Sequence, residues 1–309
     1  MQIEPDLPPC RAVIPVNGPP VRWVAPADDG DRKKLRSWCD AVGPLVVHDP
    51  TSPPAPRDRP LIVVSWNMAV GEGDLIGLLE DVRRGQADAD IDVILLLQEA
   101  YRATTPPAEC PSGSGRAGAL GLPRPPDSPD ILDTARRLGM HGVYAPSMRN
   151  GRDCKTEPRE DRGNAILSTL PLSDVTAIEL PFAQQRRVAV AALVHDGDRR
   201  IGAVSTHFDT TRGHRKMAEA IWQTMAILGW KDRVVVAGDF NSALMLDGGV
   251  REMKEHFSEL ACGTGPTHAL GSRLDHIFIG AGDKPFACRT GLQRHGSDHH
   301  PLIAILRAR

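Results

Sequence analysis

Aromatic side chains are scarce in this chain of 309 residues and make up 4% of it. Proteins that hold single strands of nucleic acid stack the bases on aromatic rings, so this scarcity disfavours a processive nucleic-acid binder. An excess of charge is also missing, because 37 Lys and Arg face 39 Asp and Glu, for a formal net charge of -2. The chain therefore has no overall basic field to attract long nucleic acids, although a local groove could still be basic.

Long apolar runs are absent as well. No stretch approaches the roughly 20 apolar residues that a membrane-spanning helix needs, so we expect no transmembrane segment. The first residues do not combine a basic region with a following apolar stretch, so no secretory signal is visible there. With 41% hydrophobic and 25% charged residues, the composition is ordinary for a globular protein.

Six cysteines are present, and none of them stands in a CxxC pair. A zinc site needs closely spaced soft ligands, so the spacing argues against a zinc-binding cysteine protein. Scattered cysteines in even number favour structural disulfides in an oxidising compartment, and unpaired, partly buried thiols are the open alternative. Paired cysteines favour a secreted or periplasmic location, and free thiols favour the cytoplasm. Pairing neighbours along the chain predicts bridges of Cys10 with Cys39, Cys110 with Cys154, and Cys262 with Cys288.

Proline divides the chain into two parts. Residues 1–57 hold many of the 27 prolines around one predicted helix at 31–42, which is typical of an ordered N-terminal arm. From Leu61 the composition changes to runs of apolar residues typical of buried strands. A sandwich of about 250 residues, the length of 58–309, can fold around one extended core. We therefore expect a proline-rich arm followed by one large domain, in a monomeric protein.

The large domain alternates buried-strand runs with amphipathic helices. Runs rich in Val, Ile and Leu predict strands, and apolar residues at helical spacing predict helices. The predicted strands are 61–66, 92–97, 164–168, 188–194, 201–206, 234–237, 274–279 and 302–306, and the predicted helices are 74–84, 213–228 and 247–257. This order predicts an α/β fold of packed layers. Residues 103–129 are rich in Pro, Gly and Ser, which indicates a long loop or lid beside Glu99.

Polar side chains gather where the predicted strands end. An acid or amide at such a place often only caps a turn or a helix, but several together indicate one cluster at the rim of a sheet. A hard divalent cation binds carboxylate and amide oxygens, which Asn67, Glu99 and Asp298 supply. Such a cluster favours hydrolysis at phosphorus. Its full set of candidates is Asn67, Glu99, His207, Asp239, Asn241, Asp275, Asp298 and His299.

Seven motifs in order resemble those of the endonuclease/exonuclease/phosphatase superfamily, over about residues 58 to 309. A chance match of seven ordered motifs is improbable. The motifs are Ser65-Trp66-Asn67, Leu97-Gln98-Glu99, Arg162-Gly163-Asn164-Ala165-Ile166-Leu167-Ser168, Ser205-Thr206-His207, Gly238-Asp239-Phe240-Asn241, Leu274-Asp275-His276-Ile277 and Ser297-Asp298-His299-His300-Pro301.

The resemblance implies a four-layered α/β sandwich, with two packed mixed sheets flanked by helices. It implies that residues 58–309 are the catalytic domain and that Glu99 binds Mg²⁺, or Mn²⁺, with help from Asn67 and Asp298. It further implies that Asp239 and Asn241 handle the attacking water and the phosphate. The remaining implied role belongs to His299, which Asp275 would orient for phosphate contact or proton transfer. Residue chemistry agrees, because a carboxylate on one imidazole nitrogen stabilises imidazolium.

With histidine at position 207, the chain resembles the deoxyribonuclease-like and sphingomyelinase-like branches of the superfamily. The abasic-site endonuclease branch has tyrosine at this place, so the resemblance disfavours dedicated abasic-site repair. His300 would point away from His299 on an extended segment, so we expect it to be structural. The candidates for substrate contact are Asn150, Arg162 and Asn164. Other arginines could complete a positive rim, although a solvated surface role is commoner for any one of them: Arg149, Arg186 and Arg187.

We therefore expect a magnesium-dependent phosphoesterase in which water attacks phosphorus in line, with a nuclease-like phosphodiester hydrolase favoured. A lipid or inositol-phosphate phosphoesterase of the same fold is the first alternative, because specificity resides in loops. The expected partner is accordingly a phosphate ester, either a nucleic acid or a phospholipid or inositol phosphate. A non-catalytic binding module on this scaffold is the contrasting class, and it would be expected to lose residues such as Glu99 or His299.

Overall fold

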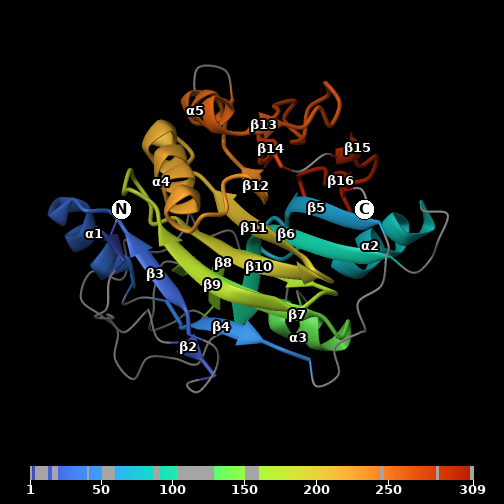
Figure 1. Ribbon diagram of the computed structural model, residues 1–309, viewed down its shortest axis with the longest axis horizontal. Helices are drawn as coiled ribbons and strands as arrows, with labels where there is room; N and C mark the ends of the chain where they lie inside the picture. The colour runs from blue at the N-terminus through green and yellow to red at the C-terminus, as the bar shows by residue number, and fades with distance from the viewer. Residues whose placement is uncertain are drawn as a thin grey trace.

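The computed structural model describes residues 2–3, 13–15, 20–39, 42–50, 60–85, 91–103, 129–149, 160–243, 247–282 and 285–306. Over these residues the chain is an α/β sandwich in which two mixed sheets pack face to face between helices (Figure 1). The four-layered architecture implied by the sequence motifs is confirmed.

Each sheet has eight strands. In spatial order the first sheet contains β1 (Gln2–Ile3), β3 (Arg22–Ala25), β9 (Leu172–Glu179), β10 (Val188–Asp196), β11 (Arg199–His207), β12 (Val234–Asp239), β14 (Asp275–Ile279) and β13 (Ser258–Glu259). The second sheet contains β15 (Pro285–Thr290), β16 (Leu302–Leu306), β5 (Leu61–Asn67), β6 (Asp92–Ala103), β8 (Glu160–Ser168), β7 (His141–Arg149), β4 (Leu45–His48) and β2 (Val13–Ile14).

Strands buried on both faces explain the continuous apolar runs of the sequence. Along β5, Leu61 and Val63 enter the core between the sheets, whereas Ile62 and Val64 enter the core under the helices. Alternate side chains of a strand point to opposite faces, so a strand covered on both sides needs apolar residues throughout.

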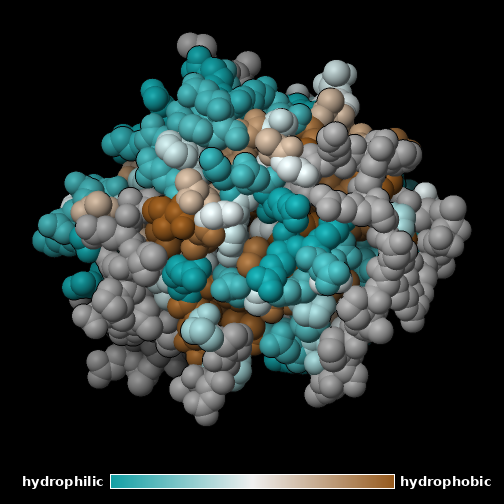
Figure 2. All heavy atoms as spheres, viewed as in Figure 1, coloured by the Kyte–Doolittle hydropathy of each residue, from teal (hydrophilic) through white to brown (hydrophobic). Residues whose placement is uncertain are grey.

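Helices cover the outer face of each sheet. α2 (Leu75–Arg84) and α3 (Ile131–Arg137) pack on the second sheet, and α4 (His214–Ile227) and α5 (Gly248–His256) pack on the first. On α4, Met217 and Ile221 are four residues apart and both are buried. Hydrophilic side chains cover the outward faces of α4 and α5 (Figure 2).

The N-terminal segment is built into the sandwich where the structure describes it. Strand β3 pairs with β9 of one sheet, and β4 pairs with β7 of the other. Trp23 and Leu45 lie in the core between the sheets. Helix α1 (Asp29–Cys39) follows β3, two residues earlier than the predicted helix start, and its Trp38 contacts Phe182 edge to face.

Eleven predicted elements of the large domain are present, with boundaries shifted by a few residues. The sequence pattern did not predict β7, β9, β13, β15 and α3, which are very short or contain Gly, Pro or polar residues and lack an unbroken apolar period. Most of the predicted lid, residues 104–128, lies outside the described residues. No helix in the described ranges is both long enough and apolar enough to cross a membrane.

One predicted disulfide is confirmed, because Cys262 and Cys288 are bonded. It links the segment after β13 to β15 and so joins the ends of the two sheets. Cys10, Cys110 and Cys154 lie outside the described residues, as does the side chain of Cys39, so the other two pairs stay predictions.

Candidate active site

Strand register brings the polar residues of one sheet into a row. β11 runs parallel to β12, and β14 runs antiparallel to β12, so that His207 stands beside Asp239 and Asp239 beside Asp275. Gly238 makes the close pairing possible, since a Cβ there would lie 1.8 Å from the carbonyl oxygen of Thr206. The other sheet brings Asn67, at the end of β5, beside Gln98 of β6.

Glu99 lies on a bulge in the middle of β6. The prediction that the strand ends there is wrong, because β6 continues to Ala103 with a register shift between Leu97 and Ala100. Glu99 itself has a positive φ of 49°. A bulge inserts a residue and re-aims its side chain, which explains how this carboxylate faces the active-site cavity although its neighbours are paired.

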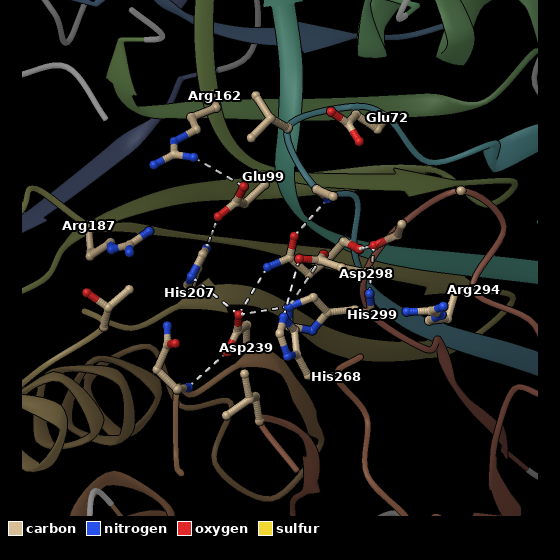
Figure 3. A pocket seen from close by; sticks show the side chains of 18 of the residues that line it. Glu72, Glu99, Arg162, Arg187, His207, Asp239, His268, Arg294, Asp298 and His299 are labelled. Atoms are coloured by element: carbon tan, nitrogen blue, oxygen red, sulfur yellow. Dashed lines mark hydrogen bonds and ion pairs between the residues drawn. The ribbon is translucent and has the colours of Figure 1, made fainter. Parts of the chain in front are cut away.

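These residues surround one cavity of about 580 Å³. Side chains from both sheets and from the loops that follow or precede their strands point into it (Figure 3). The polar side chains among its lining residues are Asn67, Glu72, Glu99, Arg162, Gln185, Arg187, His207, Thr210, Asp239, Asn241, His268, Arg294, Ser297, Asp298 and His299.

Asp239 is the centre of the hydrogen-bond network. Its Oδ2 accepts from Nδ2 of Asn67 at 3.0 Å and lies 3.4 Å from Nε2 of His207 and 3.7 Å from Nε2 of His299. Its Oδ1 accepts from the backbone N–H of Asn241 at 2.9 Å. Burial, and then repulsion from Asp275, raise the pKa of Asp239 to about 7.

His299 is kept protonated by Asp275, whose carboxylate lies outside the cavity lining. Its Nδ1 donates to Oδ2 of Asp275 at 2.8 Å, and its Nε2 faces Asp239. Burial lowers the pKa of His299, but the charge and hydrogen bond of Asp275, with help from Asp239 and Asp298, outweigh burial and raise it to about 9. Asp275 does not line the cavity, so it acts through His299.

His207 is neutral for the opposite reason. Burial, followed by the positive charges of Arg187 and Arg162, holds its pKa well below the usual 6.5. Its Nδ1 lies 3.9 Å from Glu99 and its Nε2 3.4 Å from Asp239, so the neutral ring bridges the two carboxylates. It can donate one hydrogen bond without adding charge.

Two arginines form the positive side of the cavity. Nη1 of Arg162 donates to Oε2 of Glu99 at 3.2 Å. Arg187 is buried, and burial together with the charge of Arg162 lowers its pKa to about 10, which leaves it charged at neutral pH. Two guanidinium groups beside a carboxylate cluster suit a ligand that carries phosphoryl oxygens.

One expected substrate contact, Asn164, and one candidate rim arginine, Arg186, lie away from the cavity. Asn164 is buried away from the cavity, where Nδ2 donates to the carbonyl of Val188 at 2.6 Å and links the two sheets. Arg186 is also buried, and it pairs with Glu179. Asn150 lies outside the described residues, whereas Arg162 lines the cavity as expected. His300 bonds the carbonyl of Gly291 from Nδ1 and lies outside the cavity lining, as a structural role requires.

Five cavity residues were missed by the sequence reading: Glu72, Gln185, Thr210, His268 and Arg294. All five are in turns or loops, where no periodic pattern marks which way a side chain points. The neighbouring motif Leu274-Asp275-His276 offered one signal for His268, six residues upstream in the same connection. Figure 3 shows His268 beside His299, with Asp298 above them.

The donor chemistry of the cavity fits a hard divalent cation. Glu99 and Asp298 provide carboxylate oxygens, and Asn67 provides an amide oxygen that accepts one hydrogen bond from the N–H of Ala69. Oxygen ligands of this kind suit Mg²⁺ or Mn²⁺. Burial, followed by the charge of Asp275, raises the pKa of Asp239, and a cation beside it would favour the ionised carboxylate.

Known proteins resemble the chain in family and in fold. The model of the Endonuclease/Exonuclease/phosphatase family matches residues 64–299. No curated protein matches the chain significantly. Solved structures of similar fold include an endonuclease/exonuclease/phosphatase from Beutenbergia cavernae DSM 12333, with TM-score 0.56, 17% identity, and coverage of 81% of this chain and 72% of that one.

Two further structures share the fold at low identity. The human Nocturnin catalytic domain with bound sulfate has TM-score 0.54 and 18% identity, and the match covers 84% of this chain and all 100% of that one. TDP2 of D. rerio, complexed with a single-strand DNA product, has TM-score 0.53 and 14% identity, with 80% and 99% covered. At these identities the likeness concerns the fold alone.

Proposed function

The chain belongs to the endonuclease/exonuclease/phosphatase family, and from this premise we propose that it is a magnesium-dependent phosphodiester hydrolase. The observation that carries the proposal is Asp239, a buried carboxylate that contacts Asn67, His207 and His299 within one cavity. A binding module has no need to place a carboxylate, whose pKa is raised to about 7 by burial and by Asp275, beside an imidazolium.

In this proposal Asp239 would accept a proton from an attacking water. Burial and the neighbouring carboxylate of Asp275 raise the pKa of Asp239, and a raised pKa makes a carboxylate a stronger proton acceptor. Asn241, whose backbone N–H bonds Oδ1 of Asp239, and Asn67, whose amide bonds Oδ2, hold the carboxylate in one orientation. The water would then face phosphorus from the Asp239 side of the cavity.

His299 would stabilise the negative charge that develops on the oxygens of the substrate. As an imidazolium with Nε2 directed to the cavity, it can hydrogen-bond a phosphoryl oxygen or give a proton to a leaving oxygen. Arg162 and Arg187 would bind the other phosphoryl oxygens. A divalent cation held by Glu99, Asn67 and Asp298 would neutralise charge that develops on those oxygens.

Specificity within this reaction resides in the loops around the cavity. Phosphodiesters of nucleic acid are the favoured substrates, and lipid or inositol phosphates are the alternative. The cavity offers both arginines and carboxylates but, in the described residues that line it, no Phe, Tyr or Trp on which a base could stack. Any nucleic acid would therefore be held by its phosphates more than by its bases.

A hydrolysis panel tests the proposal. Plasmid DNA, RNA, bis-p-nitrophenyl phosphate, sphingomyelin and inositol phosphates are incubated with the protein and Mg²⁺ or Mn²⁺, with EDTA as the control. We expect cation-dependent release from at least one phosphodiester and none in EDTA. Hydrolysis of inositol phosphates alone would replace the phosphodiester assignment. Binding of these compounds without any turnover would assign a binding module.

A further inference from the structure

His268 stands beside two residues of the candidate active site. Its Nε2 lies 3.3 Å from Oδ2 of Asp298, and its ring meets the ring of His299 edge to face, with centroids 4.7 Å apart. One ligand atom from each of these three residues falls within 4.8 Å of the others, a spacing that could hold a metal ion. The question is whether His268 is a metal ligand or a hydrogen-bond donor.

The hydrogen bond at the second ring nitrogen of His268 indicates that the residue is a donor and not a metal ligand. Nδ1 accepts a hydrogen bond from the backbone N–H of Leu270 at 3.1 Å, so Nδ1 carries a lone pair and no proton. In the neutral ring the proton is then on Nε2. A metal ligand needs a lone pair on the nitrogen that faces the ion, and in this tautomer the nitrogen facing Asp298 has none.

The turn around His268 holds the ring in this state. Residues 267–272 close on themselves, with the N–H of Gly271 donating to the carbonyl of His268 at 2.9 Å. The same turn is fastened to the catalytic segment by two backbone bonds, from Ala269 to the carbonyl of Asp298 and from His300 to the carbonyl of Thr267. The ring and the carboxylate therefore keep their relative positions.

Asp298 needs such support because its side chain is 53% exposed, whereas that of His268 is 15% exposed. A half-exposed carboxylate rotates freely unless a neighbour holds one oxygen. With Oδ2 held by His268, Oδ1 is left 3.9 Å from Nε2 of His299, on the cavity side.

We propose that His268 is a positioning residue that donates from Nε2 to Oδ2 of Asp298 and directs Oδ1 toward the bound cation. The inference rests on the proposed function, in which Asp298 is one of the cation ligands. It adds a residue that acts through Asp298 and contributes no nitrogen ligand, so the cation site remains one of oxygen donors.

Two variants distinguish the contribution of the His268 N–H donor from that of its aromatic ring. His268→Phe keeps an aromatic ring but removes the donor, and His268→Gln keeps an N–H at a similar distance from the backbone. Free Mn²⁺ is measured by electron paramagnetic resonance during titration of each protein. Since losing an outer partner of a ligand costs roughly 10- to 100-fold in metal affinity, we expect that loss in His268→Phe and most of the affinity back in His268→Gln.

A second readout does not depend on metal or on activity. Long-range ¹H–¹⁵N spectra of the metal-free protein distinguish the two neutral tautomers, and we expect the proton of His268 on Nε2. A proton on Nδ1, or equal losses of Mn²⁺ affinity in both variants, would assign His268 as a direct ligand and overturn the inference. Unchanged affinity in His268→Phe would overturn it too.

Other measurements show whether the proposed function, and not the role of His268, is wrong. If the wild-type protein binds no Mn²⁺, and Asp298→Asn behaves like the wild type, then the cation site itself is absent. If wild type binds Mn²⁺ and Asp298→Asn does not, the site stands, and the His268 variants alone decide the inference. Thermal unfolding in EDTA checks that each variant is folded.

Discussion

Nδ1 of His299 donates a hydrogen bond to Oδ2 of Asp275 over 2.8 Å, and both side chains are buried. The carboxylate therefore fixes which nitrogen of the imidazole faces the cavity. It also holds the ring as a cation against burial, which is why the pKa of His299 is raised to about 9.

Asp275→Asn should lower the pKa of His299 from about 9 by at least about one unit. The variant removes the carboxylate charge that raises this pKa, whereas burial still lowers it. A raised histidine pKa contributes stability below the unfolded value of 6.5 and loses it as pH rises through about 9. The stability difference between wild type and variant should therefore be largest below pH 6.5 and shrink toward pH 9. Imidazole resonances of metal-free protein give the pKa, and urea unfolding gives the difference. An unmoved His299 titration would contradict the assignment.

Glu99→Gln and His299→Ala should each lower turnover at least about a hundredfold while the fold stays intact, because both residues face the cavity and not the core. Rates are compared after EDTA treatment and return of Mg²⁺. His300→Ala is the matched control, since that ring bonds the carbonyl of Gly291 outside the cavity lining. Near wild-type rates in both active-site variants would end the catalytic assignment.

Asp161→Asn should change how stability depends on pH. Burial raises the pKa of Asp161 from 3.8 to about 7, although the N–H of Gly43 donates to it at 2.7 Å. The folded protein therefore keeps a proton that the unfolded chain releases, and wild-type stability falls as pH rises from about 4 to 7. The variant lacks this loss, so it should gain relative stability across that window, by about 1.4 kcal/mol per unit of pKa shift. Parallel pH curves from urea unfolding would refute the prediction.

Cys262→Ser should destabilise the protein by roughly 3 kcal/mol, since the bridge to Cys288 closes a loop of 26 residues. Equilibrium unfolding measures the loss, and reduced wild type should match the variant. Peptide mapping under non-reducing conditions should recover this bridge, and it also tests the pairs of Cys10 with Cys39 and Cys110 with Cys154. Six free thiols in natively expressed protein would reject the oxidising-compartment argument.

Trp38→Ala should raise KM several-fold with little change in kcat. Trp38 of α1 contacts Phe182 at 6.0 Å between ring centroids, and the loop that contains Phe182 continues to Gln185 and Arg187 in the cavity. Loss of the contact should make the loop from Phe182 to Arg187 less ordered without changing the position of Asp239. Steady-state kinetics on the substrate identified in the panel provide the measurement. Trp222→Ala, which loses a stack on His256 of α5, is the control expected to leave KM unchanged.

The sequence alone determined the layered α/β class and most of the site. Asn67 and Asp239 each end an apolar run, and Asp275 stands at the start of another. Such runs must be buried strands whatever the topology, so their polar ends must reach a rim. The ordered motifs then identified the family. These features are local in the sequence, so they can be recognised without knowing which strands are neighbours.

Tertiary structure decided what the pattern leaves open. Arg186 and Arg187 are adjacent, yet one pairs with Glu179 in the interior and the other lines the cavity. Neighbouring side chains on an extended chain point to opposite sides, and only packing decides which side is the cavity.

The bulge at Glu99 and the tautomer of His268 are similar cases. The first depends on a register shift against β8, and the second depends on a backbone N–H in its own turn and a carboxylate 30 residues away. Contacts between segments distant in sequence leave no periodic trace, so the folded chain alone could reveal them.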